Sequence, residues 1–199
     1  MNAAALTRLV LATANAGKQR EFAALLAPRG IEVLLQSAFG VQSIEETGTT
    51  FEANALLKAR HAAAATGLAA LADDSGLEVD ALQGRPGVHS ARYAGEQAGD
   101  AVNNALLLQE LAAVPDERRT ARYRCVLVLV RGAADPAPLI VSGAWEGRIA
   151  RAPSGQGGFG YDPLFIPAGL SLSAAQLPAD EKNARSHRGQ ALRALLDRL

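Results

Sequence analysis

Apolar positions along the chain change repeatedly between the continuous runs of buried strands and the spacing of helices. The run from Leu9 to Ala12 is typical of a buried strand, and the apolar side chains from Phe22 to Leu26 then recur at the i, i+3, i+4 spacing of a helix. Pro and Gly at residues 28–30 end that helix, and residues 31–35 predict the next strand. This order of strand, loop, helix and strand is typical of an α/β protein.

The middle of the chain predicts a second helix and another short strand. Thr49 and Glu52 have the spacing of a capping box, which predicts a helix from there to Gly67. The apolar run at residues 68–72 predicts a short strand that ends at the two aspartates that follow. A third helix is expected over residues 101–111.

The last third of the chain alternates between strand and loop signals before a final helix. Residues 123–130 and 139–145 are rich in strand formers and are separated by a Gly-Asp-Pro turn, which predicts an antiparallel hairpin. Residues 155–163 form a long glycine-rich loop, and Ser186 is a good N-cap for a C-terminal helix. We find no repeat or linker, so residues 1–199 are expected to form one domain with a mixed sheet.

Composition excludes several classes of function. The 199 residues carry 20 Lys and Arg against 20 Asp and Glu, and a formal net charge of zero argues against broad binding of nucleic acid or anionic membranes. Cys125 is the single cysteine, so neither an internal disulfide nor a multi-cysteine zinc site is possible. Met1 to Thr13 lacks the pattern of a secretion signal, and the apolar runs are too short for a membrane span. We therefore expect a cytoplasmic protein.

The turn from Thr13 to Lys18 is a candidate phosphate site. It joins a strand to a helix, so free backbone N–H groups and the positive end of the helix dipole meet there. Asn15 adds an amide and Lys18 a point charge suited to phosphate. The glycine spacing of a P-loop is missing, and this segment alone favours an ordinary strand–helix turn with a surface lysine.

Two pairs of acidic residues are candidate metal ligands. Glu45-Glu46 lies in a polar loop, and Asp73-Asp74 follows the predicted apolar strand, where ligands of open α/β sheets bind. Magnesium takes one or two carboxylates together with substrate phosphates, and a further carboxylate could accept a proton from water. The alternative is that these acids are solvated turn residues.

Two segments near the C-terminus could recognise a flat ligand. Phe159 lies between glycines, which favours an exposed ring that stacks on a ligand, although it could instead fill the core with Tyr161. Lys182, His187 and Arg188 could donate hydrogen bonds to oxygen atoms on the edge of a base. The alternative is a helix capped by Ser186 with solvated neighbours.

Six segments together resemble the inosine/xanthosine triphosphate pyrophosphatase family (HAM1-like, bacterial branch) over nearly the whole chain. They are residues 13–18, 45–48, 52–59, 72–76, 159–163 and 186–188. The resemblance implies a two-lobed α/β subunit that holds a nucleotide in a cleft between its lobes and forms a homodimer. It also implies Mg²⁺-dependent hydrolysis of ITP, dITP and XTP to a monophosphate and pyrophosphate, which cleanses the nucleotide pool.

The resemblance assigns roles to individual residues of this chain. The metal ligands would be Glu45, or less favourably Glu46, together with Asp74, which would also be the proton acceptor. The phosphate ligands would be Thr13, Asn15, Lys18 and Lys58. The other substrate-binding residues would be Ser75, Phe159, Gly160, Tyr161, Asp162, Lys182, His187 and Arg188.

One departure and two rival functions stay open at this point. The family commonly has glycine where this chain has Ala14, and a left-handed Ala14 would be strained by about 1 kcal/mol. A Maf-type pyrophosphatase acting on modified pyrimidine nucleotides is the nearest rival enzyme. A nucleotide-binding regulator without turnover is the rival outside enzymes, but such a protein has little use for Asp74 as a general base.

Overall fold

The computed structural model describes residues 6–199. The first five residues, which belong to the segment expected to carry no secretion signal, lie outside the described residues. Six strands form one sheet in the order β2-β1-β3-β4-β5-β6. Their bounds are β1 Arg8–Leu11, β2 Glu32–Leu35, β3 Ala70–Val79, β4 Thr120–Val130, β5 Leu139–Ile149 and β6 Phe165–Pro167. β1 is parallel to β2 and to β3, whereas β5 and β6 are antiparallel. The predicted mixed sheet of an α/β protein is confirmed.

The chain divides into two compact units, in line with the expected two-lobed organisation. Unit 1 comprises the chain up to Asp74, Val126–Ser142 and Ala191–Leu199, and unit 2 comprises Ser75–Cys125 and Gly143–Gln190. Strands β3, β4 and β5 each contribute residues to both units, and β3 passes from unit 1 to unit 2 between Asp74 and Ser75.

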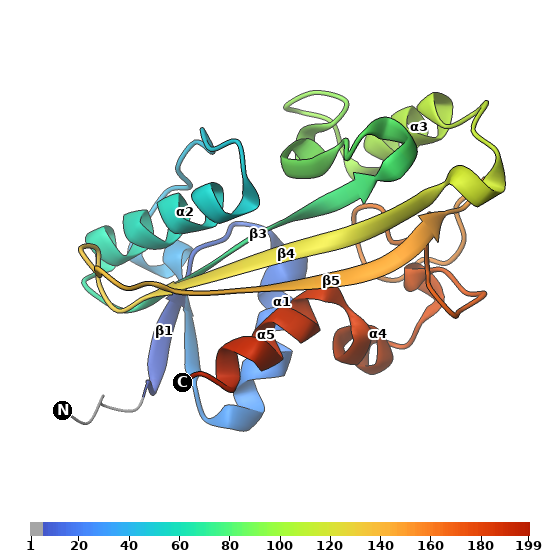
Figure 1. Ribbon diagram of the computed structural model, residues 1–199. Coiled ribbons are helices and arrows are strands. Elements are labelled where there is room, and N and C mark those ends of the chain that lie inside the picture. Colours follow the sequence, from blue (N-terminus) through green and yellow to red (C-terminus); the bar gives the residue numbers. More distant parts are fainter. Residues whose placement is uncertain (1–5) are drawn as a thin grey trace. The chain divides into compact units, whose positions relative to one another are not determined.

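Helices cover both faces of the strands in unit 1. The helices are α1 Ala16–Leu26, α2 Phe51–Thr66, α3 Asp100–Glu110, α4 Ala179–Arg185 and α5 His187–Leu196. In unit 1, α2 lies on one side of the strands, and α1 and α5 lie on the other (Figure 1). The alanines of α2 pack with Val10, Ala12 and Val128, so small side chains let this helix approach the sheet closely. Leu9 and Leu11 are fully buried and, by the alternation of a strand, face the opposite side.

The second helix begins one residue later than the sequence predicts. Thr50, rather than Thr49, is its N-cap, and the Thr50 hydroxyl accepts a hydrogen bond of 3.1 Å from the backbone N–H of Ala53. Thr50 is the last residue with extended backbone before the helix, so its hydroxyl reaches the free N–H groups of the first turn. The helix ends at Gly67 as predicted, because that glycine adopts the left-handed conformation.

Strand β3 is longer than predicted and continues through the two aspartates. The apolar run at residues 68–72 suggested an end at Ala72, but β3 extends to Val79. Its parallel neighbour β1 ends at Leu11, which pairs with Leu71. Asp73 and Asp74 therefore lie just beyond the carboxyl end of β1, although they are inside β3.

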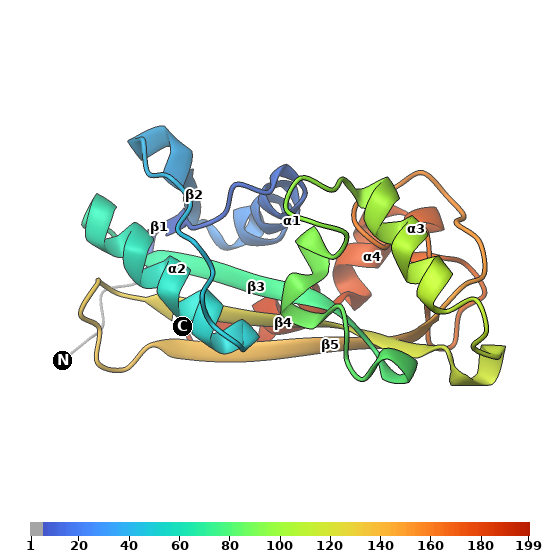
Figure 2. The same cartoon turned by 90° about the horizontal axis from the view of Figure 1, so that it is seen from above.

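Unit 2 has its own apolar core between α3 and the sheet. Leu107 and Leu111 pack with Leu77, Trp145 and Phe165 in one buried cluster. Helix α3 is seen in front of the strands of this unit in Figure 2. The helix over residues 101–111 and the long strands at 123–130 and 139–145 were predicted, whereas α4 and β6 were not. Short 3-10 helices occur at Ala27–Arg29, Gln36–Phe39, Asp80–Leu82, Gly87–Arg92, Asp116–Arg118 and Ala174–Gln176.

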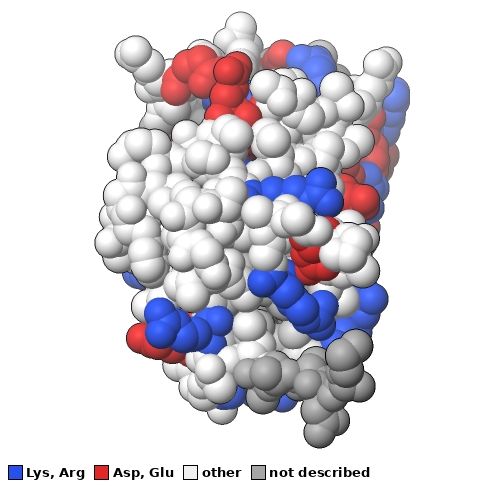
Figure 3. Space-filling view, turned by 90° about the vertical axis from the view of Figure 1, so that its left-hand side faces the viewer, with Lys and Arg blue, Asp and Glu red and all other residues white. Residues whose placement is uncertain are grey.

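Charged side chains of both signs are interspersed on the surface. On the face drawn in Figure 3, basic and acidic residues lie among many uncharged ones. Because the chain has no net charge, a strongly charged ligand must be held by a local cluster of side chains.

In the described part of the chain, no helix is long and apolar enough to cross a bilayer.

Candidate active site

The turn between β1 and α1 is built by its own side chains. The Thr13 hydroxyl accepts from the N–H of Asn15 at 3.1 Å, and the Asn15 side chain accepts from the N–H of Lys18 at 3.1 Å as the N-cap of α1. Gln83 is the single described residue other than glycine with positive φ, so Ala14 is not left-handed. The strain considered for Ala14 is absent, and alanine fits this turn.

Two lysines and three acids meet in unit 1. Lys18 from α1 forms an ion pair with Asp73, which is fully buried. Lys58 from α2 contacts Glu46 at 2.6 Å and Asp74 at 2.9 Å. The structure therefore brings the candidate phosphate-binding lysines to the candidate catalytic aspartate, and it adds Asp73, a candidate metal ligand to which the family resemblance assigns no role.

Burial and charge change the protonation of this cluster in opposite ways. Burial raises the pKa of Asp74 above its ordinary value, although Lys58 opposes that shift. Burial by itself lowers the pKa of Lys58, but the carboxylates of Asp74, Glu46 and Asp73 outweigh it and raise that pKa above its ordinary value. Lys58 thus stays a cation beside Asp74, which is more basic than an ordinary aspartate.

Glu46 is the glutamate that the structure brings to Asp74. Its carboxylate and that of Asp74 contact the same ammonium group of Lys58, whereas Glu45 is exposed. Two carboxylates that converge on one cation suit the oxygen-ligand chemistry of magnesium. Among the described residues no group of three or more His, Cys, Asp and Glu side chains could hold a metal ion, so a metal here would need further oxygen ligands from substrate or water.

Asn54 connects two parts of this cluster. It is fully buried in α2, donates from Nδ2 to Asp74 at 3.3 Å, and accepts from the N–H of Gly48 at 2.8 Å. A side chain on Gly48 would lie 2.6 Å from the Asn54 oxygen, so only glycine fits there. Sequence reasoning gave Asn54 no role, although an amide inside an alanine-rich helix was a visible signal.

In unit 2, the carboxylate of Asp162 accepts hydrogen bonds from two of the predicted base-binding residues. Asp162 is almost fully buried and accepts hydrogen bonds from the N–H of Phe159 at 2.9 Å and from Lys182 at 2.8 Å. The Tyr123 hydroxyl donates to its other oxygen at 3.2 Å. Burial raises the pKa of Tyr123 well above its ordinary value, with Asp162 adding to the effect, so the phenol stays a donor.

Phe159 and Tyr161 have different environments, which separates the two interpretations offered for them. Tyr161 belongs to the core of unit 2, and its hydroxyl donates to the carbonyl of Ser90 at 2.8 Å. Phe159 is only half-buried, and Lys182 and Arg188 lie 5.0 Å and 5.1 Å from its ring centre. Cations at this distance stabilise an aromatic ring that the core does not cover.

His187 and Arg188 are buried rather than solvated. His187 is 2% exposed and stacks on Tyr123 with ring centres 4.7 Å apart. Arg188 is 4% exposed and donates to the Ser75 hydroxyl at 2.8 Å. Ser186 caps α5 as predicted, because its hydroxyl accepts from the N–H of Gly189 at 3.2 Å.

Helix α3 holds the loop that carries Phe159. Asp100 accepts from the N–H of Gly160 at 2.6 Å, and Asn104 donates to the carbonyl of the same residue at 3.0 Å. These two side chains are four residues apart, on one face of the helix. The sequence predicted α3 but gave it no part in the site.

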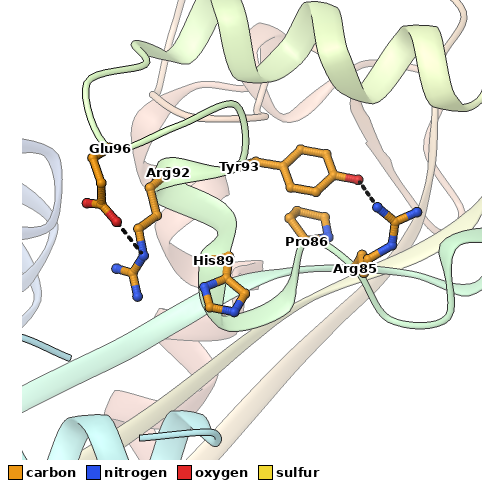
Figure 4. A pocket seen from close by; sticks show the side chains of 6 residues that line it. All are labelled: Arg85, Pro86, His89, Arg92, Tyr93 and Glu96. Carbon is orange, nitrogen blue, oxygen red and sulfur yellow. Dashed lines mark hydrogen bonds and ion pairs between the residues drawn. The ribbon is translucent and has the colours of Figure 1, made fainter. Parts of the chain in front are cut away.

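A pocket of about 490 Å³ lies in another part of unit 2. Its six lining residues, drawn in Figure 4, are Arg85, Pro86, His89, Arg92, Tyr93 and Glu96. Arg92 pairs with Glu96 at 3.4 Å, and Arg85 pairs with Glu110 at 3.1 Å, so its arginines are neutralised by neighbouring acids.

Comparison with known proteins identifies relatives over almost the whole chain. The model of the Ham1 family matches residues 9–198. The dITP/XTP pyrophosphatase of Shigella flexneri is 57% identical over 194 residues, which cover 98% of each chain. The solved structure of a HAM1 protein from Coxiella burnetii has a TM-score of 0.87 and 52% identity over 94% of this chain and 95% of that one. The Staphylococcus aureus Ham1 protein has a TM-score of 0.82 and 40% identity, again over 94% and 95%.

These matches show that the chain is a pyrophosphatase with a mixed α/β fold. The chain belongs to the Ham1 family. The resemblance found in the sequence is thereby confirmed, and so is the prediction that this chain is a hydrolase.

The ion pair between Lys182 and Asp162 provides a test of the site in unit 2. Both side chains are almost fully buried, so Lys182→Met leaves a buried carboxylate without its cation and should lower the free energy of unfolding by about 3 kcal/mol. Arg185→Met removes an exposed pair from the same helix and should cost less than about 1 kcal/mol. Urea unfolding followed by circular dichroism measures both, and equal losses would contradict the buried pair.

Proposed function

We propose that the protein hydrolyses the deaminated purine nucleoside triphosphates ITP, dITP and XTP to a monophosphate and pyrophosphate, with Mg²⁺. The observation that carries this proposal is the cluster in which the buried Asp73 and Asp74 meet the partly exposed Lys18, Lys58 and Glu46. The names of the relatives, dITP/XTP pyrophosphatases, support the choice of substrate.

The phosphate end of the substrate is assigned to unit 1. Lys18 and Lys58 supply positive charge, and Thr13 and Asn15 shape the N-terminus of α1, where backbone N–H groups favour an anion. Both lysines already pair with carboxylates, so they are held in place before a phosphate arrives. Because three acids accompany the two lysines, a triphosphate is proposed to bind at this cluster together with Mg²⁺, whose charge would offset the carboxylates.

The proposed metal ligands are Asp74 and a glutamate of the Glu45-Glu46 pair. Glu46 contacts Lys58 together with Asp74, which favours it over the initial choice of Glu45. A bound Mg²⁺ supplies positive charge that stabilises the pyrophosphate leaving group.

Asp74 is proposed to accept the proton of the attacking water. Its carboxylate is held at both oxygens, by Lys58 and by Asn54, which fixes the direction in which it can take a proton. Attack on the α-phosphorus then needs no covalent intermediate on a serine or cysteine. Lys18 and Lys58 would stabilise the negative charge that develops on the phosphate oxygens.

The base end is assigned to unit 2. Phe159 is proposed to stack on the purine, and Ser75, Gly160, Tyr161, Asp162 and His187 to complete this part of the site. Arg188 and Lys182 can donate to the oxygen at position 6 of hypoxanthine or xanthine. Adenine presents an amino donor there, and a donor left without an acceptor costs roughly 1–3 kcal/mol.

The setting of the enzyme is proposed on the same grounds. A single buried cysteine, which has no second cysteine to pair with, suits a reducing compartment, and a house-cleaning role in the nucleotide pool suits the cytoplasm. The resemblance further supports a homodimer that acts on free nucleotides.

The proposal predicts a selective, metal-dependent activity. Pyrophosphate release should be fast from ITP, dITP and XTP, slow from ATP and UTP, and abolished by EDTA, because the leaving group then lacks its cation. Chromatography of the nucleoside monophosphate product measures all five substrates with and without EDTA. Faster turnover of UTP than of ITP would favour the Maf-type alternative, and ITP binding without turnover would favour the regulator.

Asp74→Asn should remove nearly all hydrolysis and leave the fold intact. The amide is isosteric but cannot accept the proton, and a loss of about 10²–10⁴-fold in kcat is expected for a general base. Asp80→Asn is the control, because Asp80 is an exposed aspartate of the chain that pairs with Arg122. Wild-type turnover by Asp74→Asn at an unchanged melting temperature would show that the base has been misassigned.

A further inference from the structure

Asn54 is a fully buried amide that contacts the proposed proton acceptor. Its Oδ1 accepts from the backbone N–H of Gly48, and its Nδ2 donates to Oδ2 of Asp74. The first bond reaches the loop that carries Glu46, and the second reaches β3. A single side chain thus links two elements that supply carboxylates to the cluster.

The chemistry of these two neighbours determines which residue can occupy the position. The N–H of Gly48 needs an acceptor and the carboxylate of Asp74 needs a donor, so the amide can point in only one direction. Aspartate at this position would keep the acceptor but would set one carboxylate against another. Leucine or alanine would provide neither group. An amide of this length satisfies both neighbours.

The geometry of Asp74 shows why the donor matters. Lys58 donates to Oδ1 at 2.9 Å and Asn54 donates to Oδ2 at 3.3 Å, so the carboxylate is held from both sides. Asn54 and Lys58 are four residues apart and lie on the same face of α2. Rotation of the carboxylate would break at least one of these bonds.

We propose that Asn54 is a positioning residue, which holds the Asp74 carboxylate and the Glu46–Gly48 loop in the arrangement that hydrolysis requires. This inference rests on the function proposed above, and it extends the contact of Asn54 with Asp74 described there to the Glu46–Gly48 loop and to the metal dependence of the reaction. Asn54 acts through Asp74 and the loop, so its loss should change turnover and metal dependence more than substrate binding.

Asn54→Ala tests the inference. Side chains that hold metal ligands in place typically contribute about 10–100-fold to metal affinity or activity, so kcat should fall and the half-saturating Mg²⁺ concentration should rise by about 10-fold or more. The affinity for ITP in EDTA, measured by isothermal titration calorimetry, should stay that of the wild type, because the phosphate-binding lysines remain.

Asn103→Ala is the matched control. Asn103 is also a buried helical amide, which accepts from the N–H of Ala94 at 2.8 Å and donates to the carbonyl of Ala91 at 3.2 Å. Its removal should lower the melting temperature comparably and leave the Mg²⁺ dependence unchanged. A merely structural role for Asn54 would make the two variants alike.

Asn54→Leu guards against a loss of folding caused by the cavity in Asn54→Ala. It keeps the approximate size of the side chain and adds no charge but provides neither hydrogen bond, so kcat should again fall while metal-free ITP binding persists. Wild-type kcat in Asn54→Leu, or weakened metal-free ITP binding in both variants, would overturn the inference while wild-type activity stood. A wild-type chain without Mg²⁺-dependent release would overturn the proposed function, and this inference with it.

Discussion

The pairing of two buried aspartates with two lysines is the interaction on which unit 1 depends. Asp73 is fully buried and Asp74 is 5% exposed, and burying such carboxylates without partners would cost several kcal/mol each. Lys18 and Lys58 offset that cost from two different helices. The fold therefore needs the same cations that a triphosphate needs. Stability and the proposed chemistry are consequently coupled through these side chains.

The elements of the fold could be predicted from the sequence where local signals decide them. The caps at Asn15 and Ser186 act within one helical turn, and Gly67 ends its helix by its own conformation. The C-terminal end of strand β3 could not be predicted from local signals. Aspartates rarely lie inside a strand, and only the tertiary pairing around Asp73 and Asp74 keeps the chain extended there. The short α4 was not predicted, because its start lacks a side-chain cap and so carries no local signal.

Much of the candidate site could be anticipated from residue types, but its internal pairing could not. Lysines and acids indicated phosphate and metal chemistry, whereas the contact of Glu46 rather than Glu45 with Lys58 depends on the path of a loop. Asn54 stands out in the sequence as an amide inside an alanine-rich helix, but its role could not be assigned until the structure gave its neighbours, Gly48 and Asp74. Phe159 and Tyr161 looked equivalent in the sequence, and only the packing of unit 2 separates a core residue from a half-buried ring.

The proposed reaction, with Asp74 as the proton acceptor, requires that water attack the α-phosphorus of a purine triphosphate. Hydrolysis of ITP in water labelled with oxygen-18, followed by mass spectrometry of both products, shows which phosphorus is attacked. Attack at the α-phosphorus places the label in the nucleoside monophosphate and leaves pyrophosphate unlabelled. Label in pyrophosphate would mean attack at the β-phosphorus, and labelled orthophosphate would mean attack at the γ-phosphorus. Either result would exclude the proposed reaction.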